Sequence, residues 1–227
     1  MNNKALTSLL HLSDPTLPIG GYTHSYGLES YVQSGAVNDS ESAREFVENS
    51  LRHNLLYNDA LYVRIAWCRS AERSYEELEE FDNELTAVKS PREIRQASLK
   101  LGVRLLKIFC RKLSGEGVES LSQIAKRGGG HYPIIYGAVA QMLGLSLHDT
   151  LLSFYYNTMV CMVTNAVKLI PLGQISGQEI IFELEEKIDE MVAATIEIDE
   201  EMRGVCAVGF DIASMQHERL YSRLYMS

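Results

Sequence analysis

The sequence predicts an all-α fold, a single helical domain of about eight to ten helices. Apolar residues recur at helical spacing over most of the chain, and alternating β-branched runs bounded by hairpin turns are absent from the sequence. All five prolines lie at the ends of these periodic runs or in the first loop. The 227 residues are 46% hydrophobic, which suffices for one core, and no linker or repeat divides residues 1–227.

The chain opens with an irregular stretch, SDPTLPIGGYTHSYGLE, at residues 13–29. It sustains neither a helical nor an alternating period. Pro15 and Pro18 each fix φ and remove a backbone donor, so a helix is not expected before residue 19. A helix could begin at Thr23, which would cap it, and carry Tyr26 in its first turn. We therefore expect residues 13–29 to form a shaped loop that packs against a helical body.

The remaining helices follow from periodicity and capping signals. The expected ranges are about 41–71, 75–88, 90–113, 121–126, 133–143, 147–170, 176–194 and 211–216. Start signals are the capping boxes Ser42 to Glu45 and Ser176 to Glu179, and Ser90 as the cap before Pro91 and Glu93. Residues 147–170 are hydrophobic on several sides and are expected to be the central helix, or a subunit interface in a dimer.

Two predicted helices carry strongly charged faces. Range 75–88 has an apolar stripe surrounded by acids that include Asp82, which indicates a surface helix with a solvated acidic face. Range 90–113 carries the one concentrated basic face, formed by Arg92, Arg95, Lys100, Arg104, Lys107 and Arg111. A basic face is typical of a solvated surface, and a docking surface for an acidic partner is the sharper alternative.

Composition limits the function classes. The formal net charge of -9 argues against a general nucleic-acid binder, which must neutralise phosphates. No apolar run reaches the roughly 18 to 20 residues of a membrane span, and residues 1–10 lack the pattern of a signal peptide, so we expect a cytoplasmic protein. The four cysteines are widely spaced among apolar neighbours and are expected to be reduced and buried: Cys68, Cys110, Cys161 and Cys206.

No catalytic or metal motif is complete in the sequence. His217 and Glu218 resemble the start of a zinc-protease HExxH motif, but Tyr221 occupies the place of the second histidine. Gly128 to Gly130 lack the lysine and the preceding strand of a phosphate-binding loop, which indicates a flexible turn. The six histidines are scattered, and no nucleophile elbow or dinucleotide-binding fingerprint is present. The residues alone therefore predict a soluble helical protein with an irregular N-terminal motif and an aromatic, basic C-terminal tail.

Four stretches resemble the urease accessory protein UreF family. They are SDPTLPIGGYTHSYGLE, SPREIRQASLKLGVRLL (90–106), the region that starts with NAVKLIPLGQ (165–178), and the terminus HERLYSRLYMS (217–227). The family more often has arginine where this chain has Lys168, and a lysine lacks the planar fork of donors that arginine offers.

The resemblance implies an all-helical assembly factor, usually a homodimer, without turnover of its own. It implies an adaptor that acts with UreD (UreH in some organisms) and the GTPase UreG to deliver nickel into apo-urease. It implies no cofactor for this chain, because the assembled complex handles the nickel. Carried over to this sequence, the expected partner-binding or tail-ordering residues are Tyr22, His24, Tyr156, Lys168, His217, Tyr221 and Arg223. Arginine and tyrosine are also residue types that dominate interface energies.

Two other functions stay open. The chain could regulate GTP hydrolysis by UreG through an arginine supplied in trans, for which Arg95, Arg104 and Arg223 are candidates. It could instead carry nickel itself, bound through His24, His131 or His217.

Overall fold

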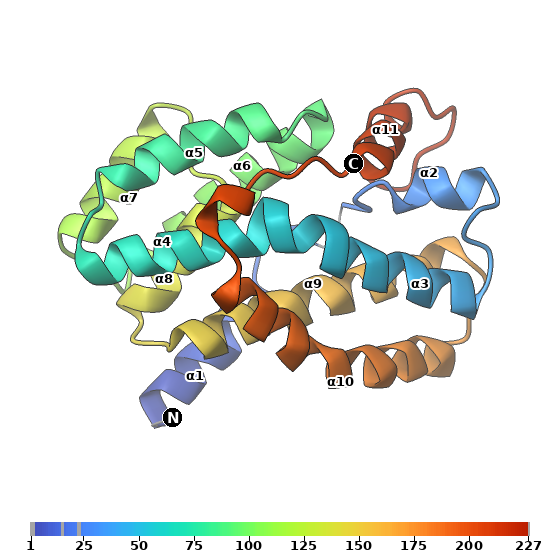
Figure 1. The fold of residues 1–227 in the computed structure, drawn as a ribbon, viewed down its shortest axis with the longest axis horizontal. Helices are drawn as coiled ribbons and strands as arrows, with labels where there is room; N and C mark the ends of the chain where they lie inside the picture. The colour runs from blue at the N-terminus through green and yellow to red at the C-terminus, as the bar shows by residue number, and fades with distance from the viewer. Residues whose placement is uncertain (1–2, 15, 22–23, 227) are drawn as a thin grey trace.

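The structure is a computed structural model that describes residues 3–14, 16–21 and 24–226. Within these residues the fold is helical, without strands, and forms one domain (Figure 1). It has ten helices when α3, the π-helix η2 and α4, which follow one another without a break, are counted as one. The predicted fold class is confirmed.

The helices have the following bounds. In the first half they are α1 (Asn3–Leu12), α2 (Leu28–Gln33), α3 (Ser40–Ser50), the π-helix η2 (Leu51–Ala60), α4 (Leu61–Glu72), α5 (Glu77–Val88) and α6 (Arg92–Phe109). In the second half they are α7 (Glu116–Lys126), α8 (Tyr132–Met142), α9 (Leu147–Leu169), α10 (Gln174–Glu197), the short 3-10 helix η3 (Glu200–Met202) and α11 (Val208–His217). None of the described helices has the length and apolar character needed to cross a bilayer.

The run from α3 through η2 to α4 is the long buried helix that the sequence predicts. Its start differs from the predicted capping box of Ser42 and Glu45. The Asp39 carboxylate accepts a bond from the Ser42 amide at 2.8 Å, and the Ser42 hydroxyl lies 3.1 Å from the Asp39 amide. A side-chain acceptor on the residue before the helix satisfies amides that would otherwise lack partners, so the helix begins at Ser40.

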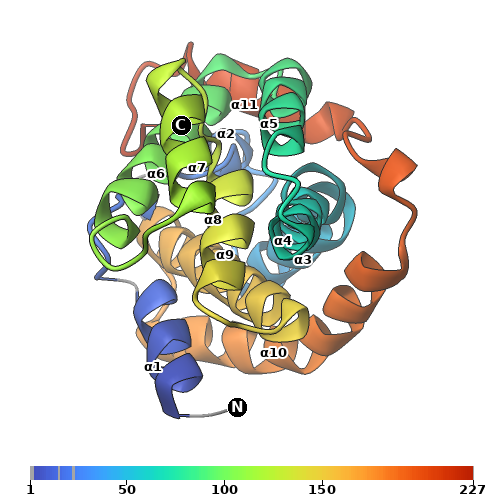
Figure 2. The same ribbon diagram turned by 90° about the vertical axis from the view of Figure 1, so that its left-hand side faces the viewer.

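The core lies where α8 is enclosed by α4 and α6 (Figure 2). Every residue of α8 from Pro133 to Ala140 is buried. Two glycines permit the close approach of the backbones. A Cβ on Gly137 would lie 2.3 Å from the Val63 carbonyl oxygen of α4, and one on Gly102 of α6 would lie 2.0 Å from the Gly130 carbonyl oxygen. Only glycine fits at such separations.

The helices α9 and α10 form the opposite layer and run antiparallel (Figure 1). The N-cap Ser146 accepts a bond from the Asp149 amide at 3.0 Å and starts α9 as predicted. Buried Tyr155 of α9 and Thr195 of α10 join their hydroxyls at 2.8 Å. Because α10 covers many of its apolar residues, α9 is a central helix, and its part in a subunit interface stays a prediction.

The start of α10 was predicted wrongly. The helix begins at Gln174, with Gly173 before it, so Ser176 lies inside the first turn instead of capping it. The Gly177 amide donates to the Gly173 carbonyl at 3.2 Å. The helical hydrogen bonds therefore begin before Ser176, and the helix starts two residues earlier than predicted.

Asp82 is not on a solvated acidic face, which corrects the prediction for α5. Its side chain is buried and accepts bonds from the amides of Gly130 at 2.9 Å and His131 at 2.6 Å. Burial raises the pKa of this carboxyl, and the two amide bonds oppose the rise. The glycine turn before α8 is thus held in place by Asp82 and is not the flexible turn that the sequence indicates.

Three further helices, α1, α7 and α2, also differ from the prediction. The helix α1 has no counterpart in the predicted ranges, and α7 begins at Glu116, inside the predicted loop. The helix α2 begins at Leu28 because Tyr26 and Gly27 have φ of 54° and 82°, left-handed values that a right-handed helix excludes. Thr23, the predicted cap, lies outside the described residues.

The cysteines are free but are not buried. Cys110 and Cys206 are exposed, and Cys68 and Cys161 are half-buried. Cys110 caps the end of α6 and Cys206 lies in the segment before α11, so apolar sequence neighbours do not place either of them in the core.

We expect Gly137→Ala to destabilise the fold, because the added methyl group must push α8 away from α4. Overpacking of this kind costs about 1–3 kcal/mol. Urea unfolding of the purified variant measures the loss. Gly209→Ala, at an exposed position in α11, is the matched control, since a Cβ there meets nothing closer than the Tyr31 hydroxyl at 3.7 Å, and it should leave the free energy of unfolding unchanged or slightly raised. Equal midpoints for the two variants would contradict the packing argument.

Candidate partner-binding site

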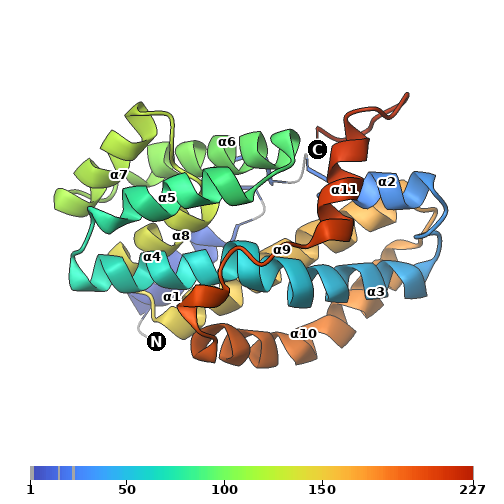
Figure 3. The ribbon, with the colours of Figure 1, turned by 45° about the horizontal axis from the view of Figure 1, so that its top comes forward.

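The end of the 13–29 stretch and the C-terminal tail meet at Glu29, the second residue of α2. The left-handed Gly27 precedes it, and a Cβ at Gly27 would lie 2.9 Å from the Ser214 hydroxyl of α11. Glycine therefore lets α2 lie directly against α11. The Ser30 hydroxyl donates to the Ala213 carbonyl at 2.8 Å across the same contact. Figure 3 shows α11 and the final segment packed beside α2 at one end of the molecule.

Glu29 holds the C-terminal tail, residues 217–226, by side-chain contacts on both of its oxygens. Oε1 accepts a bond from the Leu224 amide at 2.7 Å. Oε2 lies 3.0 Å from His217 Nε2 and accepts from the Tyr225 amide at 3.2 Å. Glu29 is only 3% exposed, so these bonds form where water does not compete with them. Gln33, one turn later, donates to the Ser222 carbonyl at 2.9 Å.

Glu93 of α6 supplies a second carboxylate that contacts the tail. Glu93 Oε2 lies 2.6 Å from His217 Nδ1, and Oε1 accepts from Arg223 Nη1 at 2.9 Å. The imidazole of His217 is fully buried between the two carboxylates, whereas the Arg223 side chain is 42% exposed. We call the four residues Glu29, Glu93, His217 and Arg223 the tail junction.

The loop at residues 13–29 is braced by the same helices. Arg104 of α6 donates to the Ile19 carbonyl at 2.8 Å, and Asn165 of α9 donates to the His24 carbonyl at 2.8 Å. The four stretches singled out in the sequence thus lie together in space. Each of them supplies at least one side chain or carbonyl to the tail junction or to the loop beside it.

An apolar surface adjoins the tail junction. On α11 the exposed side chains Val208, Ile212 and Met215 are spaced four and three residues apart and share one face of the helix. In the tail the exposed apolar side chains are Tyr221, Leu224 and Met226. We call these six residues the C-terminal apolar surface. Exposed apolar groups concentrated in one segment indicate contact with another molecule.

Apart from His24, the predicted site residues divide into three groups. Tyr22 lies outside the described residues. His217 and Arg223 belong to the tail junction, and Tyr221 is fully exposed beside them. Tyr156 and Lys168 are exposed on α9 and take no part in the contacts of the tail junction. Their roles in partner binding stay predictions.

His24 is placed as a support of the loop. It is 4% exposed, and its ring lies 6.3 Å from that of Tyr26. Burial, together with the positive charges of Lys100 and Arg104, lowers its pKa to about 4, so the imidazole is neutral at pH 7.

Glu29 and Glu93 are the residues that the sequence analysis missed. Glu29 ends the first quoted stretch, and Glu93 was assigned to a capping box with Ser90. The helix α6 instead starts after Pro91 without a side-chain cap, which leaves the Glu93 carboxylate free to face His217. The signal that could have found both acids is the position of each one inside a stretch that resembles the family.

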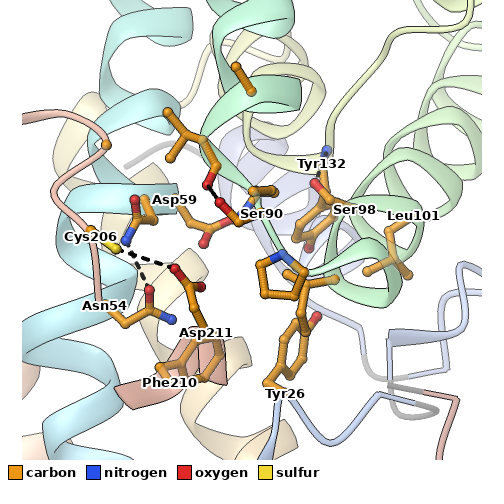
Figure 4. Close-up of a pocket in the computed structure, with 17 residues that line it drawn as sticks. Tyr26, Asn54, Asp59, Ser90, Ser98, Leu101, Tyr132, Cys206, Phe210 and Asp211 are labelled. Atoms are coloured by element: carbon orange, nitrogen blue, oxygen red, sulfur yellow. Dashed lines mark hydrogen bonds and ion pairs between the residues drawn. The ribbon is translucent and has the colours of Figure 1, made fainter. Parts of the chain in front are cut away.

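A polar cavity of about 250 Å³ lies between η2, α6 and the segment before α11 (Figure 4). Figure 4 shows Asn54, Asp59, Cys206 and Asp211 gathered on one side of it and Tyr26, Ser98 and Tyr132 on the other. Lys89 Nζ lies 2.9 Å from Asp59 Oδ1 in its wall, with side chains 6% and 19% exposed. Burial raises the pKa of Asp59 and of Asp211. Because two acids face one lysine, the wall is acidic overall.

Neither the cavity nor the tail junction has the geometry of a metal site. Within residues 3–14, 16–21 and 24–226, no three His, Cys, Asp or Glu side chains are grouped so that they could hold a metal ion. The two ring nitrogens of His217 face Glu93 and Glu29 on opposite sides of the ring, so these groups do not converge on one point. His131 lies 3.0 Å from the Ser98 hydroxyl and 2.9 Å from that of Thr86, and burial lowers its pKa to about 3.

The fold and the site define a class of protein: a helical protein whose C-terminal tail is held by α2 and α6 beside an exposed apolar face, as in proteins that act by binding others. Comparison with known sequences identifies the family. The UreF family model matches residues 37–185. The chain belongs to the UreF family.

Curated relatives match over nearly the whole chain. A urease accessory protein UreF of Haemophilus influenzae is 46% identical over 230 residues, which cover 99% of this chain and 98% of the relative. One from Actinobacillus pleuropneumoniae serotype 5b is 46% identical over 226 residues, covering 98% and 99%. One from Geobacillus kaustophilus is 35% identical over 228 residues and covers both chains completely.

We expect Glu29→Gln to loosen the tail. An amide has one oxygen where the carboxylate has two, so it cannot accept from His217 and both tail amides. Losing charge-assisted bonds costs about 1–3 kcal/mol, which corresponds to at least several-fold faster cleavage of an opened tail. Trypsin digestion at Arg219 and Arg223, followed by mass spectrometry, measures the rate. Glu179→Gln on the exposed face of α10 is the control and should be cut at the wild-type rate.

We expect Lys89→Met to destabilise the fold, because it leaves the Asp59 carboxylate buried without its counter-charge. Breaking a buried ion pair from one side costs about 3–5 kcal/mol. The double variant Asp59→Asn with Lys89→Met should recover part of this loss in urea unfolding. A double variant less stable than Lys89→Met alone would show that the pair is not the source of the effect.

Proposed function

We propose that this protein is an adaptor in urease maturation. In this proposal it binds UreD (or UreH) and UreG in the cytoplasm as a homodimer, and the assembled complex delivers nickel to apo-urease. The chain itself has no turnover and no cofactor. Membership of the UreF family supports the role in urease maturation, and the names of the relatives describe accessory proteins.

The observation that carries the proposal is the C-terminal apolar surface. Its six side chains are 43% exposed or more. Exposed apolar area is unfavourable in water at about 25 cal/mol per Å². A partner that covers this surface recovers that free energy on binding. The tail junction fixes the tail relative to α11, which lowers the entropy lost when the partner binds.

The alternative of a regulator of GTP hydrolysis has weaker support. Each candidate arginine donates to its own chain: Arg95 to the carbonyls of Lys89 and Ser90, Arg104 to that of Ile19, and Arg223 to Glu93. An arginine that acts in trans must leave such contacts. The GTPase rate of UreG with and without the complex of this protein and UreD decides between the two functions.

We expect Ile212→Glu to prevent or strongly weaken co-purification with UreD. The substitution places a charge at the centre of the α11 face, and a loss of at least about 1.4 kcal/mol lowers the affinity tenfold. Co-expression of tagged UreD with each variant, followed by affinity purification, measures the complex.

Phe182→Glu on α10 is the matched control, because Phe182 is also apolar and 60% exposed but lies on a different helix. It should co-purify like the wild type. If Ile212→Glu also co-purifies fully, the α11 face is not the binding surface.

A further inference from the structure

We propose that Glu29 and Glu93 form a proton-dependent receptor for the C-terminal tail, which docks when His217 is an imidazolium and is released when His217 loses its proton. The inference rests on the proposed function, since it concerns the surface by which the adaptor binds its partner. It adds a control of that surface by pH.

The first argument is the geometry of the hydrogen bonds. Both ring nitrogens of His217 face carboxylate oxygens, at 3.0 Å on the Glu29 side and 2.6 Å on the Glu93 side. A carboxylate only accepts, and a neutral imidazole has only one N–H. The observed contacts are therefore satisfied only when a proton is present on both ring nitrogens.

The second argument is the balance of charge. The tail junction contains two carboxylates, one guanidinium and the imidazole, so it is neutral when His217 carries its proton. Loss of that proton leaves one net negative charge beside a fully buried ring and points a ring lone pair at a carboxylate. Arg223 cannot compensate fully, because its partly exposed side chain is screened by water.

The third argument is the direct link between the proton and the tail backbone. Glu29 Oε2 contacts both His217 and the Tyr225 amide, while Oε1 accepts from the Leu224 amide. A Glu29 carboxylate that moves away from a neutral imidazole also leaves the two amides. The tail then loses its two bonds to Glu29, while the bond from Gln33 to the Ser222 carbonyl and the packing of α11 remain.

The charged groups around His217 are Glu29 from α2, Glu93 from α6 and Arg223 from the tail. Nearby His24 has a pKa of about 4 and stays neutral. Burial raises the pKa of Tyr225 to about 12, so its phenol keeps its proton. Imidazole is the side chain that ordinarily titrates near pH ~6.5.

The direction of the effect follows from proton counting. The docked tail requires one more proton than the released tail, so docking is favoured at low pH and is lost as the pH rises. Linkage limits the change in the docking constant to tenfold per pH unit for one proton. A partner that binds the docked tail therefore binds more tightly below neutrality than above it.

Hydrogen exchange of the purified protein tests the proposal. Protection of the Leu224 and Tyr225 amides is measured by mass spectrometry from about pH 6 to about pH 9, the range that spans imidazole titration. Each value is divided by that of a free peptide of the tail sequence at the same pH, which removes the intrinsic pH dependence of exchange. We expect protection in the wild type to fall by tenfold or more, while peptides from α9 and α10 keep theirs.

Two variants should respond in opposite ways. Glu93→Gln offers an N–H to the neutral imidazole and still offers an oxygen to Arg223, so its tail should stay protected at high pH. His217→Gln carries both of its donors on one nitrogen, so it cannot reach carboxylates that lie on opposite sides of the imidazole, and its tail should be unprotected at every pH. Circular dichroism confirms that each variant is folded.

Wild-type protection that does not change with pH would overturn the proposal, as would a Glu93→Gln variant with the same pH dependence as the wild type. The measurement uses this chain alone, so its outcome is independent of whether UreD binds. Conversely, a failure of the Ile212→Glu test would refute the binding surface and leave the pH dependence of the tail standing.

Discussion

The contact between Glu29 and His217 is the interaction on which the partner-binding end of the molecule depends. It joins residues near the two ends of the chain across the interface of α2 and α11. The same carboxylate binds two tail amides, so one side chain fixes both the last helix and the segment that follows it. A buried acid needs such partners, because an ionised carboxylate without them is strongly unfavourable in a protein interior. The buried hydrogen bonds of Glu29 therefore fix α11 and the tail, and with them the apolar side chains of these segments that stay exposed.

Local signals predicted most of the helices. Apolar periodicity located the long run from α3 to α4, and Pro171 marked the end of α9. Apolar periodicity alone placed the start of α9 at residue 147, without its cap Ser146, and the capping rules failed at Ser176, because α10 already begins at Gln174. Asp82 was misplaced because its partners are backbone amides 48 and 49 residues away. Helical periodicity depends on residues a few turns apart, so it cannot predict hydrogen-bond donors this distant in the sequence.

The candidate site was predicted in part. His217, Arg223 and Tyr221 were chosen through resemblance to the family, and the structure places them together at the tail. Glu29 and Glu93 could not be found by spacing, since they lie 188 and 124 residues from His217. Each acid also had a plausible local explanation, as the end of a loop stretch or as part of a helix start. Only the fold shows that both face one imidazole.

The π-helix η2 determines how α3 and α4 are rotated relative to each other in the continuous run from α3 to α4. Its wider turns place more side chains per revolution than the flanking α-helical segments do, and Asn54, Asn58 and Asp59 face the cavity from it. Each residue of an α-helix advances the side-chain direction by about 100°. Shortening η2 by one residue would therefore rotate α4 relative to α3 and turn Tyr62 and Val63 out of the core. The number of residues in η2 therefore sets the rotation of α4 relative to α3 about the axis that they share.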